Sequence, residues 1–490
     1  MESLQKKSFK AFYWDFSGKI AGQLVAFIVS IFLARLLSPA DFGLLAMVNV
    51  IIAFSNIFLD LGLSVALVQK ANIRDEHYGS VFWFNLATGI LFTIILFFAA
   101  APLAVFYENA DIKDITRVMS LIFLINAFGR VISAKLHKEM KFDVPVKAQL
   151  GSAFFSGALG IAMAFAGFGV WSLVAQSLLF AVLSNLLLYL LEKWRPKLYF
   201  SWKALKELWG FGFRMFLSGV LNALYTNLDA LIIGKLFPAS TLGQYYRAKS
   251  TSNIIVNNAS GSLMAVFLPA LSSVQNDIER VKQIVSKSFH FICLISFFIT
   301  GLFYIVGGDC IILLFSSKWL PAVPFFELTM LSAYAYPVSA VLVNVIVAMG
   351  NSKAFLRLEI YKKLILSVNF VIGFYFGIEG FLIGFIIANA LSVLLNIGFA
   401  SNDMKVSSMW FINRSVIYIL STFVITVICK FAFMFLESSY VLHLVISGSV
   451  FCLLFIASML MFKAQGLLYV LEQITWKNVG ARLIHRFYDK

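Results

Sequence analysis

Charged side chains inside apolar stretches are the residues of this chain whose positions suggest chemistry. Five basic residues lie within such a stretch or near its start: Lys19, Arg130, Arg214, Arg247 and Lys249. A cation is costly in hydrocarbon, so it either faces an anionic partner in a cavity or extends to the headgroups at the membrane surface. Both alternatives stay open for Arg214 and Lys249, and Lys19 and Arg130 are the stronger candidates for a cavity.

Three acidic residues are placed where a charge needs a partner or a function: Asp60, Asp229 and Glu359. For Asp229, the alternative to a function is a purely structural ion pair with a cation such as Arg247. The four cysteines and five histidines have no spacing typical of a disulfide or a metal site.

The elements that carry these residues are predicted to be membrane-spanning helices. Hydrophobic residues make up 61% of the chain and charged residues only 13%, so lipid must be the solvent for most of it. About 14 apolar stretches are each long enough to cross a bilayer. They begin near residues 14, 42, 80, 116, 146, 170, 211, 242, 286, 322, 356, 380, 413 and 439. The sequence therefore predicts an all-α polytopic membrane protein.

Basic residues alternate between the predicted loops. Lys and Arg accumulate in cytoplasmic loops, and here every second loop is rich in them, whereas the remaining loops hold about five. This bias predicts an even number of spans with both termini in the cytoplasm. It also accounts for the net charge of +15 without nucleic acid. The basic tail, 465–490, fits an amphipathic helix on an anionic leaflet and a solvated tail about equally well.

An internal repeat predicts how the spans are grouped. Residues 34–43 match residues 234–243 without a gap, and 167–171 match 377–381 more weakly. Transporters are often built from two such similar bundles. The expected organisation is a six-helix lobe (1–191), a basic cytoplasmic linker (192–208), a second six-helix lobe (209–400), two additional spans (401–464) and the tail (465–490).

Several ordered motifs resemble one family. Residues 32–43, Phe-Leu-Ala-Arg-Leu-Leu-Ser-Pro-Ala-Asp-Phe-Gly, resemble the opening signature of bacterial polysaccharide and lipopolysaccharide-repeat exporters. Further similar segments lie at 80–85, 167–174, 227–235, 242–248 and 267–277. The chain thus resembles Wzx-type O-antigen repeat-unit flippases, especially colanic-acid-type members of the multidrug/oligosaccharidyl-lipid/polysaccharide exporter superfamily. The resemblance covers roughly residues 10–400.

That resemblance implies two pseudo-symmetric six-helix lobes around a central cavity that opens alternately to each membrane face. It implies a multi-pass protein of the bacterial inner membrane that flips undecaprenyl-diphosphate-linked oligosaccharide repeats for lipopolysaccharide, capsule or exopolysaccharide synthesis. A polysaccharide polymerase and a chain-length regulator are the candidate partners. No cofactor is expected, and Na⁺ or H⁺ is the candidate coupling ion.

The same resemblance suggests roles for individual residues. The five cations would oppose the diphosphate, and Asp229, on the seventh predicted span, would bind the coupling ion by analogy with related flippases. Glu359 and Asn369, on the eleventh predicted span, could complete such a site, although the sequence shows no recognisable coordinating motif there. Trp83 and Trp171 lie in the family-like motifs and are candidates for shaping the cavity, with helix packing as the alternative.

Two other functions are weighed against transport of a lipid-linked glycan. Glycan polymerases and ligases generally carry a large external loop with catalytic Arg or His, whereas the external connectors here run to roughly a dozen residues, so an enzyme is less favoured. A multidrug/cation antiporter of the same superfamily would favour acidic cavity residues for cationic drugs. Intramembrane cations outnumber acids here, which favours an anionic substrate.

Overall fold

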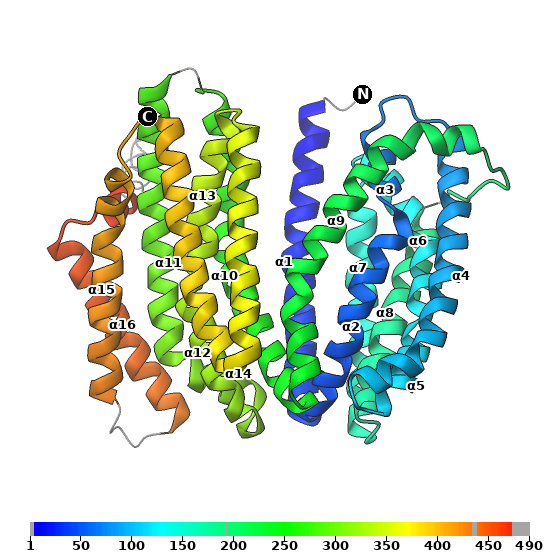
Figure 1. The fold of residues 1–490 in the computed structure, drawn as a ribbon, viewed down its shortest axis with the longest axis horizontal. Coiled ribbons are helices and arrows are strands. Elements are labelled where there is room, and N and C mark those ends of the chain that lie inside the picture. The colour runs from blue at the N-terminus through cyan, green and yellow to red at the C-terminus, as the bar shows by residue number, and fades with distance from the viewer. Residues whose placement is uncertain (1–3, 193, 276, 434–438, 473–490) are drawn as a thin grey trace, which may run out of the picture. The chain divides into compact units, whose positions relative to one another are not determined.

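The chain is folded entirely into helices in the part that the computed structural model describes, residues 4–192, 194–275, 277–433 and 439–472 (Figure 1). Of the predicted tail, residues 473–490 lie outside this part. The helices are α1 (Leu4–Leu36), α2 (Pro39–Asp60), α3 (Leu63–Gln69), α4 (Asp75–Phe106), α5 (Asp111–Met119), α6 (Leu121–Lys138), α7 (Asp143–Phe165), α8 (Val170–Leu191), α9 (Trp202–Leu236), α10 (Ala239–Ser272), α11 (Ile278–Phe315), the 3₁₀ helix η1 (Ser317–Ala322), α12 (Val323–Leu331), α13 (Ala335–Ala348), α14 (Ser352–Met404), α15 (Met409–Phe433) and α16 (Tyr440–Met461).

Twelve helical segments of the described residues are long and apolar enough to cross a membrane, so the chain is a multi-pass membrane protein. The sequence predicts about 14 spans because α10 and each half of α14 count there as separate spans. α10 is not among the twelve. α14 counts once, although its 53 residues would extend roughly 80 Å at 1.5 Å per residue, far more than a bilayer needs.

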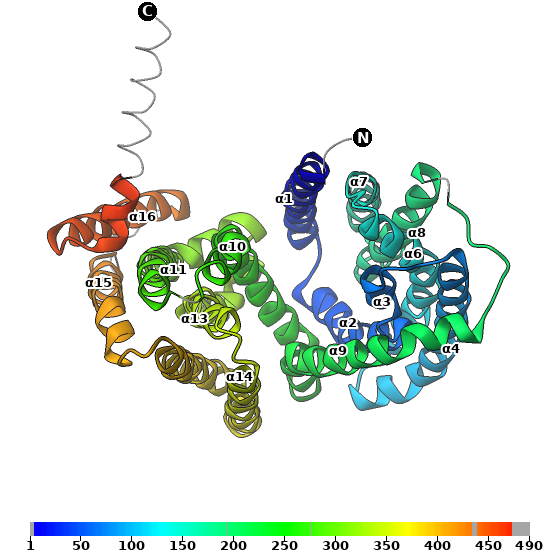
Figure 2. The ribbon, with the colours of Figure 1, turned by 90° about the horizontal axis from the view of Figure 1, so that it is seen from above.

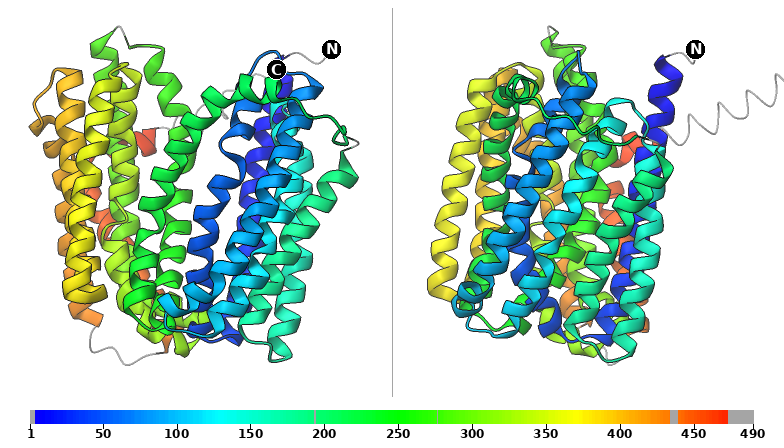
Figure 3. Two further views of the ribbon diagram at one scale, coloured as in Figure 1. Left: turned by 45° about the vertical axis from the view of Figure 1, so that its right-hand side comes forward. Right: turned by 90° about the vertical axis from the view of Figure 1, so that its right-hand side faces the viewer.

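Gly377 divides α14 into two arms, residues 352–376 and 378–404. Its φ of 72° and ψ of −166° are non-helical and lie in a region that only glycine adopts readily. The chain reverses there, and the two arms run side by side (Figures 2 and 3). This turn lies in the weaker of the two predicted repeats.

The helices form two compact units, Met1–Tyr246 and Arg247–Lys490. In the first unit, α7 packs against α1 and α8, α4 packs against α6, and α9 packs along α2, α3 and α4. In the second unit, α11 is the central helix and contacts α12, α13, α15 and α16. By packing, α9 therefore belongs with the first unit. The lobe limits from the sequence repeat stay a prediction.

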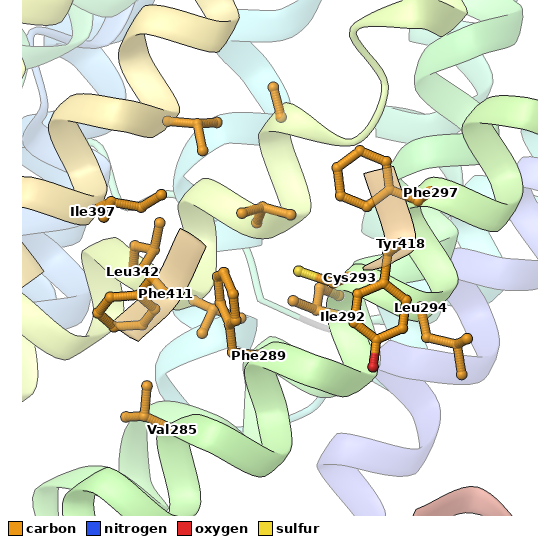
Figure 4. Packing of buried hydrophobic residues seen from close by; sticks show 14 of the residues in the cluster. Val285, Phe289, Ile292, Cys293, Leu294, Phe297, Leu342, Ile397, Phe411 and Tyr418 are labelled. Carbon is orange, nitrogen blue, oxygen red and sulfur yellow. The ribbon is translucent and has the colours of Figure 1, made fainter. Parts of the chain in front are cut away.

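The core of the second unit shows why α11 is central. Figure 4 shows Phe289, Cys293 and Phe297 of this helix facing side chains from other helices, among them Phe411 and Tyr418 of α15. The rings of Phe289 and Phe411 meet edge to face with centroids 5.1 Å apart. Buried apolar packing of this kind holds helices together in lipid, where the hydrophobic effect between helices is absent.

The family-like segment 32–43 forms the turn between α1 and α2. Ser38 caps α2: its Oγ accepts the backbone N–H of Asp41 at 3.3 Å, and the Asp41 carboxylate accepts the backbone N–H of Ser38 at 2.9 Å. Pro39 occupies the first helical turn, where its missing N–H costs nothing. This capping box explains the order Ser-Pro-Ala-Asp. The segment is thus a structural helix start.

The two matching turns of the repeat meet in the first unit. A Cβ at Gly43 would lie 1.7 Å from the carbonyl oxygen of Ala239, and a Cβ at Gly243 would lie 1.8 Å from that of Pro39. The contact is reciprocal, because Pro39 and Gly43 correspond to Ala239 and Gly243 at the repeat offset of 200 residues. The starts of α2 and α10 therefore cross backbone to backbone, which only glycine permits.

Candidate functional site

A polar pocket of about 290 Å³ opens between α6, α7 and α8 of the first unit. Most of its lining can form hydrogen bonds, which is unusual among membrane-spanning helices. The polar side chains come from Asn126, Arg130 and Ser133 of α6, Gln149 of α7, and Ser184 and Asn185 of α8. Such a set can bind hydroxyl groups and an anion together.

Close packing of α6 and α8 positions these groups. A Cβ at residue 129 would lie 1.5 Å from Oδ1 of Asn185, so Gly129 leaves the space that this amide fills. The Asn185 Nδ2 donates to the carbonyl oxygens of Ile125 and Ala181, both at 2.9 Å. The Tyr189 hydroxyl donates to the carbonyl of Phe128 at 2.7 Å, one turn further along α8. These bonds fix the pocket wall.

Arg130 is the only charged residue of the pocket lining. It is half-buried and makes no hydrogen bond or ion pair with any residue that the structure describes. It precedes the end of α6 at Lys138 by eight residues, about 12 Å along the helix axis. An unpaired guanidinium at this depth is costly unless an anion or water compensates it. Its planar set of donors matches a phosphate oxygen pair.

Two cations near the end of α6, Lys135 and Lys141, are paired with acids. Lys135 and Lys141 hold Glu139 at 2.7 and 2.8 Å, and Lys141 also lies 3.4 Å from Glu192. Burial raises the pKa of Glu139, but the hydrogen bonds from Lys135 and Lys141 outweigh it and the pKa is lowered. These side chains therefore stabilise one another, and Arg130 differs from them in having no such acid.

The other four predicted cations occupy different surroundings. Lys19 of α1 and Arg214 of α9 are exposed, and Lys249 of α10 is half-buried. Arg247 is buried in the second unit, where its guanidinium carbon lies 4.8 Å from the ring centre of Phe315 and 5.2 Å from that of Trp319. Of the five, Arg130 is the one that lines the polar pocket between α6, α7 and α8.

Asp60 is buried and connects α2 to α3. Its carboxylate accepts the backbone N–H of Ser64 at 3.0 Å, the Ser64 hydroxyl at 2.6 Å and the Asn85 amide at 3.1 Å. At the other end of α3, the Lys138 ammonium donates to the carbonyls of Leu67 and Val68 at 3.2 and 3.1 Å. An acid at the N-terminus and a cation at the C-terminus both favour the helix dipole. This geometry supports a structural role for Asp60, as an acid with partners inside the protein.

Replacing Asp60 with alanine is therefore expected to lower the free energy of unfolding by about 1–3 kcal/mol, because buried donors lose their acceptor. Asp60→Asn keeps an acceptor oxygen and is expected to lose less. Thermal unfolding of the purified protein measures both. If Asp60→Ala unfolds like the wild type yet fails to support export, the residue acts in transport instead.

The remaining predicted acids lie in separate units. Asp229 of α9 is buried and accepts a hydrogen bond from the Tyr245 hydroxyl of α10. Glu359 of α14 forms an ion pair with Lys362 on the next turn. Asn369 is buried, and neither of its amide atoms has a partner among the described residues. A joint cation site of Asp229 with Glu359 and Asn369 stays a prediction.

The two candidate aromatic residues differ in their contacts. The Trp83 Nε1 of α4 donates a hydrogen bond to the carbonyl of Lys197 at 3.1 Å. This side chain therefore holds the linker after α8 against α4. Trp171 lies in the first turn of α8, after Gly169, and is 37% exposed. The contact of Trp83 supports packing, while a part for either residue in the cavity stays a prediction.

Sequence reasoning missed an ion cluster around Glu207 of α9. Its carboxylate accepts hydrogen bonds from Lys70 at 2.6 Å and Arg74 at 3.4 Å, and Nε2 of the fully buried His77 lies at 3.1 Å. The His77 Nδ1 accepts the backbone N–H of Arg74, which leaves Nε2 to donate to Glu207. The partners lie 130 or more residues apart, so no local pattern reveals them. The cluster holds α9 to the start of α4.

Comparisons with known proteins agree with this architecture. A membrane protein from a Klebsiella pneumoniae cps region is 26% identical over 408 residues, which cover 80% of this chain and 82% of that protein. The lipopolysaccharide biosynthesis protein WzxC of Escherichia coli is 22% identical over 403 residues, with coverages of 80% and 81%.

Two solved structures share the fold. The lipid II flippase MurJ in an inward closed conformation has a TM-score of 0.71 and 14% identity over 92% of this chain and 98% of that one. An inward-facing multidrug resistance MATE transporter has a TM-score of 0.63 and 16% identity over 78% and 94%. Flippases and multidrug transporters thus share this fold, so the fold does not decide the cargo.

The family is decided by sequence. A family model described as polysaccharide biosynthesis protein matches residues 32–324, more than half of the chain, and includes the turn at 32–43 and the pocket of Arg130. The chain therefore belongs to the polysaccharide biosynthesis protein family, and the two solved structures that share its fold are transporters rather than enzymes.

Proposed function

We propose that this protein translocates undecaprenyl-diphosphate-linked oligosaccharide repeat units from the inner to the outer leaflet of the bacterial inner membrane. The product would feed lipopolysaccharide, capsule or exopolysaccharide synthesis. The observation that carries the proposal is Arg130, which has no partner among the residues that the structure describes and lies in a polar pocket inside a membrane-spanning bundle. Family membership and the similarity to a protein named for lipopolysaccharide biosynthesis support it.

The chemistry of such a cargo matches the pocket. A diphosphate carries negative charge that hydrocarbon does not solvate, so a transporter must replace its water with donors and a cation. Arg130 supplies two parallel N–H groups for one phosphate. The Asn126 amide and the Ser133 hydroxyl supply bonds for the second phosphate or the first sugar, and the Asn185 Oδ1 can accept a hydrogen bond from a sugar hydroxyl. The alternative function, a multidrug antiporter, would favour an acid at the position of Arg130, because its cargo is cationic.

Transport would proceed by alternating access, with the cavity opening first to the cytoplasm and then to the outer face. Coupling to a Na⁺ or H⁺ gradient is the proposed driving force, with Asp229 as the candidate acid because its carboxylate is buried and accepts a hydrogen bond from the Tyr245 hydroxyl. Both termini would be cytoplasmic. A polysaccharide polymerase and a chain-length regulator would receive the flipped product.

Deletion of the gene in its native host tests the function. The expected result is loss of surface polysaccharide together with accumulation of lipid-linked repeat units on the cytoplasmic side, both restored by the intact gene. Surface glycan is measured by immunoblot and the precursor by mass spectrometry of extracted lipids. Unchanged glycan with altered drug sensitivity would instead assign the protein to the antiporters.

A further inference from the structure

A groove of about 570 Å³ runs along α14 in the second unit and takes no part in the proposed transport site. Both arms of the helix line it. Its walls are apolar over most of their length and come from Ile365, Leu391, Leu394, Leu395 and Phe399. One end is polar and carries Asn351, Arg357 and Asn402. The groove is therefore amphipathic along its axis.

The length of the groove matches one leaflet of a bilayer. From Leu391 to Asn402 the second arm advances 11 residues, about 16 Å at 1.5 Å per residue. Half of a hydrocarbon core of about 30 Å has the same depth. The polar residues at 351 and 402 lie near the two outer ends of α14, where membrane helices meet the interface. One acyl chain of a lipid in that leaflet would fill the apolar part.

The polar end carries an excess of positive charge among the described residues. Arg357 is exposed and forms no hydrogen bond or ion pair with a residue within the described ranges. Lys353 lies one turn earlier on the same arm, and Lys405 follows the second arm. Two acids lie near this end: Glu359, which is paired with Lys362, and Asp403, whose Oδ1 accepts a hydrogen bond from the Asn351 amide at 2.8 Å. In the part of the chain that the structure describes, Lys353, Arg357 and Lys405 are thus balanced by Asp403 alone, which leaves a site for an anionic headgroup.

We propose that this groove binds an anionic glycerophospholipid, with one acyl chain between the arms of α14 and its phosphate at Arg357. The length of the groove favours a phospholipid over the polyprenyl tail of a transport substrate, because an undecaprenyl chain is several times longer. The bound lipid adds to the contacts between the two arms, where the rings of Phe370 and Phe381 already stack and those of Tyr361 and Phe399 meet edge to face. This inference stands independently of the proposed function.

Binding is tested on the full-length purified protein by native mass spectrometry and thermal unfolding. The probes are phosphatidylglycerol and phosphatidylcholine with identical acyl chains. Phosphatidylglycerol is expected to bind and to raise the melting temperature more than phosphatidylcholine does. Arg357→Ala is expected to bind phosphatidylglycerol about tenfold more weakly and to lose the headgroup preference.

Two tryptophan variants separate the groove from the general lipid surface. Leu394→Trp places a large ring in the groove and is expected to abolish bound lipid, whereas Leu364→Trp lies on an exposed part of the same helix outside the groove and is expected to bind normally. Equal effects of the two lipids on the wild type, or unchanged preference in Arg357→Ala, would overturn the proposal. Displacement of phosphatidylglycerol by equimolar undecaprenyl phosphate would assign the groove to the substrate tail instead.

Discussion

Replacing Arg130 with alanine is expected to reduce export of the lipid-linked glycan at least tenfold and to cause the precursor to accumulate. A hydrogen bond to a charged group contributes roughly 1.5–3 kcal/mol, so losing the guanidinium costs about 10- to 150-fold in binding of the diphosphate. Arg130→Lys keeps the charge but not the planar pair of donors, and is expected to lie between wild type and alanine. Surface glycan and accumulated precursor are the two readouts.

The protein itself is expected to tolerate the Arg130 substitution. Because Arg130 has no partner among the described residues, its removal leaves no buried group unsatisfied, and the change in stability should stay within about 0.5 kcal/mol. Arg280→Ala is the matched control, since this arginine is exposed at the start of α11 and pairs with Asp277 at 3.2 Å. Full export by Arg130→Ala at normal protein level would remove the pocket from the mechanism.

The sequence predicts well those features that depend on local chemistry. Apolar runs mark the spans because lipid requires them, and Ser38 with Asp41 marks a helix start because both bonds of the capping box close within one turn. The position of Arg130 inside a span is also a local feature, and it identified the residue as a candidate.

Features that depend on partners far along the chain could not be predicted. The lack of a partner at Arg130 becomes visible only when α6, α7 and α8 are brought together. The bonds from Lys138 to the end of α3 join residues about 70 positions apart, and the cluster at Glu207 joins residues 130 or more positions apart. The aromatic surroundings of Arg247 likewise come from Phe315 and Trp319, in other helices.

Substitution of Gly43 by alanine is expected to destabilise the protein by about 1–3 kcal/mol or more, the usual cost of inserting atoms into packed structure. The added Cβ would lie 1.7 Å from the Ala239 carbonyl oxygen, and a backbone atom cannot rotate away as a side chain can. The starts of α2 and α10 would have to separate. Gly243→Ala should have a similar effect, because its Cβ would lie 1.8 Å from the Pro39 carbonyl oxygen. Thermal unfolding in detergent measures both.

The reciprocal geometry makes a sharper prediction for the double variant. Separating the two helix starts to relieve one clash also opens space at the other, so Gly43→Ala with Gly243→Ala should cost clearly less than the sum of the single losses. Gly22→Ala is the control, since a Cβ there meets nothing within 4 Å, and alanine is expected to stabilise that helix by up to about 1 kcal/mol. Additive losses would mean that the two glycines act at independent contacts. A loss smaller than the sum of the single losses would show that one backbone crossing joins the two copies of the repeat. That crossing is built from the same position of each copy.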